Sequence, residues 1–148
     1  MAESDNDRDA VVIVAHTLAH TVGTLRAAAR AGRRVTLVSA PDAGIYAGPG
    51  WFRGVIDAAR EAVPSARFLA LLDCGDRPGA ALAAIRTEIE GVIFTGRADV
   101  TRRLADMAAR HSVRLFSERP IAALDLDDDF FASEAAIEQR CGEFFASN

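Results

Sequence analysis

FLALLDCGD, residues 68–76, is the stretch of this sequence that decides the fold. Five apolar residues run without a break into an acid, a thiol and a glycine. A continuous apolar run of this length predicts a strand buried on both faces, as in a parallel sheet. A carboxylate directly after such a strand is costly to bury unless it has a partner or a function. Asp73 is therefore a candidate functional residue.

Four other short runs have the same character and predict strands. They are VVIVA (11–15), RVTLVSA (34–40), GVIFT (91–95) and VRLF (113–116). The segments between them carry apolar residues at the spacing of an amphipathic helix. Pro49 and Pro78 fit the first turn of a helix, and Gly32 fits a helix C-cap. Strands and helices thus alternate, which predicts an α/β fold with right-handed crossovers.

The chain changes character after the fifth predicted strand. Residues 117–148 begin as an acidic loop and end in a predicted terminal helix, for which Asp129 or Ser133 is the candidate N-cap. Ile137, Cys141 and Phe144 share one side of that helix. The acidic run 125–129 lacks the spacing and the glycine of a calcium loop, so a solvated helix entry is the better interpretation.

Composition limits the classes of protein. With 148 residues, half of them hydrophobic, the chain predicts one α/β domain over 10–148 after a disordered lead-in over 1–9. The net charge of −4 argues against nucleic-acid or anionic-membrane partners. The first residues lack the pattern of a signal peptide, and Cys74 and Cys141 lie far apart. We therefore expect reduced thiols and a cytoplasmic protein.

Every one of the 17 basic residues is arginine. Arginine keeps its proton at working pH and cannot form an imine with a carbonyl substrate. Schiff-base catalysis, lysine-linked pyridoxal phosphate and the lysine-containing phosphate loop are therefore excluded.

Polar residues stand where the predicted strands end. In alternating α/β proteins, ligands bind at the carboxyl ends of the strands. We take Asp73 and Cys74 as candidate catalytic residues there. Structural roles stay open: Ser39 can satisfy a turn, and Cys74 can be a small buried hydrophobe. The candidate ligand-binding residues are His16, Ser39, Thr95 and Gly96.

A metal site is not predicted. His16 and His20 lie four residues apart and share a helix face only if the helix begins by His16. The glutamate of a zinc-protease motif is missing. His111, near the end of a predicted helix, fits an interaction with the helix dipole.

Three segments in this order resemble the first half of the class II fructose-bisphosphate aldolases and related ketose-bisphosphate aldolases. They are VTLVSAPDAGIYAGPGWF (35–52), FLALLDCGDRPGAALAAI (68–85) and GVIFTGRADV (91–100). The resemblance covers roughly residues 11–115. It implies that Ser39 contacts substrate phosphate and that Asp73 moves protons during aldol cleavage.

The sequence also departs from that family. Cys74 stands where the family has a zinc-ligating histidine, Leu71 replaces the histidine before the aspartate, and Thr95 replaces an acid. The later strands, which bring the remaining zinc histidines, have no counterpart in this chain. Catalytic zinc usually needs three protein ligands, so we expect no zinc and no other cofactor.

The resemblance predicts a parallel-stranded, partial TIM-type (βα) barrel of about five units plus a C-terminal helix. The alternative is an open Rossmann-like or flavodoxin-like three-layer sheet, which strand order 2-1-3-4-5 in place of 1-2-3-4-5 would reveal. The predicted function is a non-catalytic aldolase-like module that binds a small phosphorylated or carboxylated ligand, acts in assembly as a homo-oligomer, or both. The alternative is a lyase or isomerase with Asp73 as general base, with or without a metal.

Overall fold

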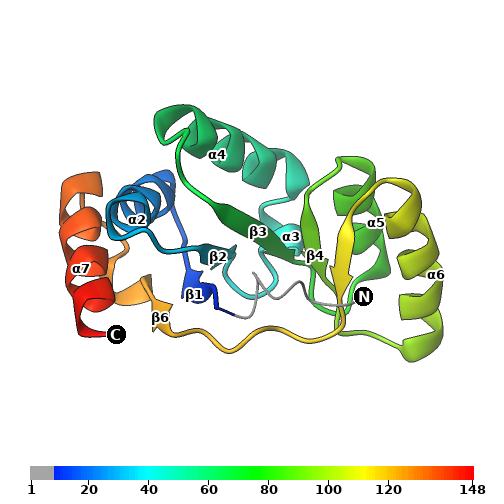
Figure 1. Cartoon of the computed structure of the whole chain (residues 1–148). Helices are drawn as coiled ribbons and strands as arrows, with labels where there is room; N and C mark the ends of the chain where they lie inside the picture. Colours follow the sequence, from blue (N-terminus) through cyan, green and yellow to red (C-terminus); the bar gives the residue numbers. More distant parts are fainter. Residues whose placement is uncertain (1–8) are drawn as a thin grey trace. The chain divides into compact units, whose positions relative to one another are not determined.

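The computed structural model describes residues 9–148 (Figure 1), so residues 1–8 of the predicted lead-in lie outside the described part. The strands are β1 (Val11–Val14), β2 (Val35–Val38), β3 (Phe68–Asp73), β4 (Gly91–Ile93), β5 (Arg114–Phe116) and β6 (Leu124–Asp125). The helices are α2 (Leu18–Ala31), α3 (Ala43–Tyr46), α4 (Pro49–Ala62), α5 (Pro78–Arg86), α6 (Ala98–Arg110), a 3-10 turn η1 (Asp127–Asp129) and α7 (Glu134–Ser147). No helix in this described range is long and apolar enough to cross a membrane.

The strands form one sheet in the order β5-β4-β3-β2-β1-β6. The pairs β3/β4, β4/β5 and β1/β6 are parallel. The first five strands are neighbours in chain order, which confirms the predicted α/β class and excludes the 2-1-3-4-5 order of the alternative. The sixth strand was not predicted, because it is only two residues long. It lies on β1, with Ile13 opposite Leu124 and Val14 opposite Asp125.

The described chain divides into two compact units, each made of separate segments. Unit 1 comprises Val38–Gly54 and Ala70–Ile121. Unit 2 comprises residues 9–37, Val55–Leu69 and Ala122–Asn148. The single domain predicted over 10–148 stays a prediction.

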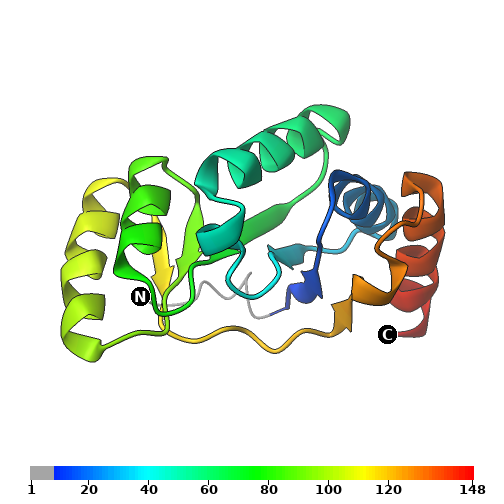
Figure 2. The same ribbon diagram turned by 180° about the vertical axis from the view of Figure 1, so that it is seen from behind.

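In unit 1 the helices α3, α5 and α6 come directly after the strands β2, β3 and β4 in the chain. α5 packs against α3 and α6, and α6 lies beside α5 in both Figure 1 and Figure 2. Pro78 is the first residue of α5 and Pro49 the first residue of α4, as predicted. A helix tolerates proline at its first position because the first N–H groups of a helix have no partner within the helix, so the missing N–H of proline costs nothing there.

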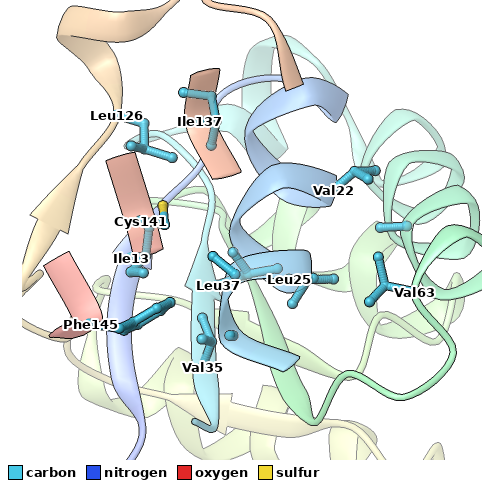
Figure 3. Close-up of a cluster of buried hydrophobic side chains, with 13 residues drawn as sticks. Ile13, Val22, Leu25, Val35, Leu37, Val63, Leu126, Ile137, Cys141 and Phe145 are labelled. Carbon is cyan, nitrogen blue, oxygen red and sulfur yellow. The ribbon is translucent and has the colours of Figure 1, made fainter. Parts of the chain in front are cut away.

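Unit 2 has its hydrophobic core between α2, α7 and the strands β1 and β2 (Figure 3). Gly32 ends α2 with φ of 64°, and the Ser133 hydroxyl accepts from the Ala136 N–H at the start of α7. Both caps were predicted. The buried face of α7 is formed by Ile137, Cys141 and Phe145. The predicted third member, Phe144, is only half-buried, because the i, i+4, i+8 spacing selects Phe145.

Gly23 sets the distance between α2 and α7, which lie side by side in both views of the chain (Figures 1 and 2). A Cβ atom at this position would lie 2.7 Å from the Glu134 carbonyl oxygen and 2.8 Å from the Ile137 Cβ. Both are atoms that cannot swing aside. Any larger residue at position 23 would therefore force the two helices apart.

We predict that Gly23→Ala destabilises the protein by about 1–3 kcal/mol, because overpacking costs this much in a close interface. The matched control is Gly142→Ala on α7, where a Cβ would have nothing within 4 Å. That change should be neutral or stabilise by up to about 1 kcal/mol through better helix propensity. Urea unfolding of the three proteins measures both effects. Equal stability of the two variants would contradict this packing.

Candidate functional site

The centre of the candidate site is the Asp73 carboxylate at the carboxyl end of β3 in unit 1. Asp73 is 4% exposed. Its Oδ1 accepts from the Gly75 N–H at 2.8 Å, and its Oδ2 accepts from Arg119 Nη1 at 2.8 Å. Both oxygens are thus engaged, one by the chain itself and one by a cation. Asp73, which the sequence indicates is costly to bury, thus has a hydrogen-bond donor at each oxygen.

Ser39, at the end of β2, holds the backbone of Asp73. Its Oγ accepts from the Asp73 N–H at 2.9 Å and donates to the Ala40 carbonyl at 3.0 Å. The side chain is fully buried. The hydroxyl therefore joins two strand ends, which is the turn-satisfying role left open from the sequence. A contact of Ser39 with phosphate stays a prediction.

Arg119 is the residue that sequence reasoning missed. It lies in the connection between β5 and β6, and besides Asp73 it donates from Nη2 to the Ser39 carbonyl at 2.9 Å. Its side chain is 25% exposed. Two of the five N–H donors of a guanidinium are used in these bonds. The only feature of the sequence at this point is that Arg119 precedes Pro120, and a charged residue before a proline is common in loops.

Cys74 follows Asp73 and is fully buried. α3 covers the thiol so closely that a Cβ at Gly44 would lie 2.6 Å from Sγ. Burial, and then the negative charge of Asp73, raise the pKa of Cys74 to about 12. A nucleophile or a zinc ligand must be a thiolate. The thiol is therefore neutral near pH 7 and acts as a small apolar side chain.

Thr95 and Gly96 follow β4 in the same unit. The Thr95 N–H donates to the Gly75 carbonyl at 2.8 Å, so the loops after β3 and β4 are joined. Thr95 is exposed. A side chain at Gly96 would collide with the buried ring of Phe94. Unit 1 therefore contains five of the predicted site residues, namely Ser39, Asp73, Cys74, Thr95 and Gly96.

Two helices begin beside these loops without a capping side chain. α5 has Arg77 and α6 has Arg97 at the N-cap, and neither side chain makes a capping bond, although Arg97 pairs with Asp99 in the first turn of α6 at 3.0 Å. Ser, Thr, Asp or Asn is the usual choice there. Uncapped helix N-termini and arginine side chains both attract anions. Carboxylates lie among these groups as well: Asp99 in the first turn of α6, the exposed Asp76 after Gly75, and Asp42 beside Gly75.

His16 lies in unit 2, between β1 and α2. Its Nε2 is 2.7 Å from Asp125 Oδ1, and its backbone N–H donates to His20 Nδ1 at 3.0 Å. α2 begins at Leu18, so the two histidines are not on one helix face. Among the described residues no group of three or more His, Cys, Asp or Glu side chains could hold a metal ion.

The zinc of the class II aldolases does not fit the residues that the sequence resemblance aligns with that family's metal site. Cys74 is buried, protonated and covered by α3. Leu71 and Thr95 offer no zinc ligand of the usual kinds. The remaining carboxylate, Asp73, is bonded through both oxygens.

An open groove of about 510 Å³ lies along α2 and α7 in unit 2. Small side chains line most of it, and Arg30 and Glu138 pair at 3.1 Å beside it. Its two charged lining residues are thus paired with each other, and Gln139 is its one other polar residue, so the residues around Asp73 remain the better candidate.

We predict that Asp73→Asn lowers stability by about 1–3 kcal/mol, because Arg119 loses its charged partner while the Gly75 N–H keeps an acceptor. The matched control is Asp76→Asn, three residues away, where the carboxylate is 76% exposed and 3.9 Å from the Arg77 Nε. An exposed pair of this kind contributes little. Thermal melts compare the two variants. An Asp73→Asn protein as stable as the control would remove the structural role of Asp73.

No protein-family profile and no curated protein matches this sequence. Among the solved structures that match is a provisionally assigned fructose-1,6-bisphosphate aldolase from Coccidioides immitis, with 17% sequence identity and a TM-score of 0.60. The match covers 74% of this chain and 42% of that one. At this identity the similarity concerns the fold alone. The chain therefore has an aldolase-like α/β fold and spans less than half the length of the solved aldolase.

Proposed function

We propose that this protein is a non-catalytic, metal-independent aldolase-like module that binds a small phosphorylated or carboxylated ligand around Arg119. The observation that carries the proposal is the double anchoring of Arg119 by Asp73 and the Ser39 carbonyl. A guanidinium held in this way is preorganised, so binding of an anion costs little conformational entropy of the arginine side chain.

The absence of catalysis is inferred from how the polar groups are used. Aldol cleavage needs a base that can take up a proton and a group that stabilises the enolate. The Asp73 carboxylate is engaged at both oxygens, and the Cys74 thiol is neutral. With no lysine in the chain, an imine cannot replace the metal. The lyase or isomerase alternative would require a substrate to reach a carboxylate whose side chain is 6% exposed.

Arg119 offers the ligand its remaining N–H donors, and the exposed hydroxyl of Thr95 belongs to the same unit. The uncapped N-terminus of α5, which has no acid in its first turn, adds favourable potential for an anion, whereas Asp99 opposes an anion at α6. The net charge of −4 makes long-range attraction of anions weak, so local donors have to provide the affinity.

We predict saturable binding of at least one of three probes, inorganic phosphate, sn-glycerol 3-phosphate and malate, in isothermal titration calorimetry. Arg119→Ala should weaken it at least about tenfold, because a hydrogen bond to a charged group contributes about 1.5–3 kcal/mol. The control is Arg103→Ala on the exposed face of α6. Failure of all three probes, or equal affinity of the two variants, would refute the ligand site. Cleavage of fructose 1,6-bisphosphate with added zinc would refute the non-catalytic part.

An assembly role belongs to the same proposal. Ile45, Tyr46 and Trp51 of unit 1 are 42%, 68% and 41% exposed, and Phe131 of unit 2 is 96% exposed. Large apolar side chains gathered in one short segment are typical of surfaces that become covered on association. A second copy of this chain is the partner that we propose.

We predict that the protein sediments as a homodimer or a larger closed oligomer at tens of micromolar. Tyr46→Ser with Trp51→Ser should shift it toward monomer if α3 and the start of α4 form the interface. Phe131→Ser tests the other exposed ring, and its effect on folding should be small at 96% exposure. A wild-type chain that sediments as a monomer would show that these side chains serve no self-association.

A further inference from the structure

His20 is a buried titratable group that the proposed function does not use. It lies in the first turn of α2 in unit 2 and is fully buried. Its backbone N–H donates to the hydroxyl of the N-cap residue, Thr17, at 3.0 Å. The ring extends from α2 toward η1, where its partner, Asp129, lies 109 residues away in the sequence. It therefore joins two segments that are remote in the sequence.

The partners of the ring determine its tautomer. Nδ1 lies 3.0 Å from the His16 backbone N–H, which can only donate, so Nδ1 must be without a proton. Nε2 lies 2.9 Å from the Asp129 carbonyl, which can only accept, so Nε2 must carry the proton. Both bonds exist together only in the neutral Nε2–H imidazole. A second proton on Nδ1 would face the His16 N–H.

The charged groups around the ring come from every neighbouring element. His16, before α2, has its ring centroid 5.8 Å away and is paired with Asp125 of β6. Asp129 of η1 is paired with Arg140 of α7 at 2.9 Å. Phe130 closes the site with its ring 6.1 Å from that of His20. The nearest carboxylates therefore already have cationic or hydrogen-bonding partners.

We infer that His20 is a pH-dependent latch that fixes the segment from β6 to α7 to the start of α2, and that acid loosens this segment before the rest of the chain unfolds. This inference is independent of the ligand site around Arg119, which lies in the other unit. It concerns the attachment of α7, whose buried face supplies part of the core of unit 2.

The direction of the pH effect follows from proton linkage. Burial lowers the pKa of His20 below its ordinary value of 6.5; the bond to the Asp129 carbonyl raises this pKa by a smaller amount, and His16 lowers it again. A released segment leaves the imidazole in water, with a pKa near 6.5. Between the two values the released state binds more protons, so the latch is fully stable above about pH 6.5 and weakens as the pH falls through this window. One pH unit below 6.5, release is favoured by up to about tenfold.

The two cysteines distinguish release of α7 from unfolding of the whole chain. Cys141 lies on the buried face of α7 with its Sγ 3.5 Å from Thr24 Oγ1, whereas Cys74 is buried in unit 1. Release of α7 exposes Cys141 alone, and global unfolding exposes both thiols. The reagent is 4,4′-dithiodipyridine, which reacts in mild acid. Rates are divided by those of the denatured protein at the same pH, and mass spectrometry identifies the labelled cysteine.

We expect the normalised labelling rate of Cys141 to rise up to about tenfold between pH 7.5 and 5.5, with the rate of Cys74 unchanged. His20→Gln, which keeps a donor for the Asp129 carbonyl and cannot titrate, should lose this response. His111→Gln, the same change at the C-cap of α6 in unit 1, should keep it. A parallel rise of both cysteines, no rise of Cys141, or an unchanged response in His20→Gln would each overturn the inference.

A second measurement does not depend on a variant that folds. Long-range proton–nitrogen correlation spectra of the wild-type protein resolve the tautomers of only three histidines. At pH 7.5 we expect His20 as the Nε2–H form and a titration midpoint below 6.5. An Nδ1–H form, or a midpoint at or above 6.5, would refute the latch.

Discussion

A carboxylate that is 4% exposed must be bonded at both oxygens, and this requirement at Asp73 organises unit 1. It brings the Gly75 N–H back toward the strand end and recruits Arg119 from the connection after β5. The turn at Gly75 requires φ of 55°, which glycine adopts without strain. A side chain there would also collide with the Asp42 carboxylate. The local conformation after β3 thus follows from the need to satisfy one buried charge.

The non-catalytic role that we propose follows from the same requirement. A catalytic base needs a lone pair that is available to a substrate proton. Here each oxygen already accepts one hydrogen bond, from Gly75 or Arg119, in a side chain that is 6% exposed, and the charge of Asp73 helps to keep the Cys74 thiol protonated. What remains accessible is the outer part of Arg119. Recognition of an anion is consequently better supported by this geometry than proton transfer.

The fold could largely be predicted because its signals are local. Apolar runs identified five strands, and Pro49, Pro78 and Gly32 marked helix ends at the observed residues. β6 was missed because a two-residue strand carries no periodicity and forms only where β1 offers an edge. The face of α7 was shifted by one residue, from Phe144 to Phe145, because adjacent phenylalanines leave the period ambiguous until Ile137 and Cys141 are placed.

The candidate site could be predicted only in part, because its polar partners are remote in sequence. A buried acid after β3 implies that some cation compensates it, and in a chain without lysine that cation had to be one of 17 arginines. Nothing local distinguishes Arg119, which is 46 residues from Asp73. His20 shows the same limit with a different outcome. Its partner on η1 is a backbone carbonyl 109 residues away, so the burial is compensated without charge. A pattern predicts that a buried polar group has a partner, and the tertiary fold decides whether that partner is a cation, which fixes a charge, or a backbone group, which fixes a tautomer.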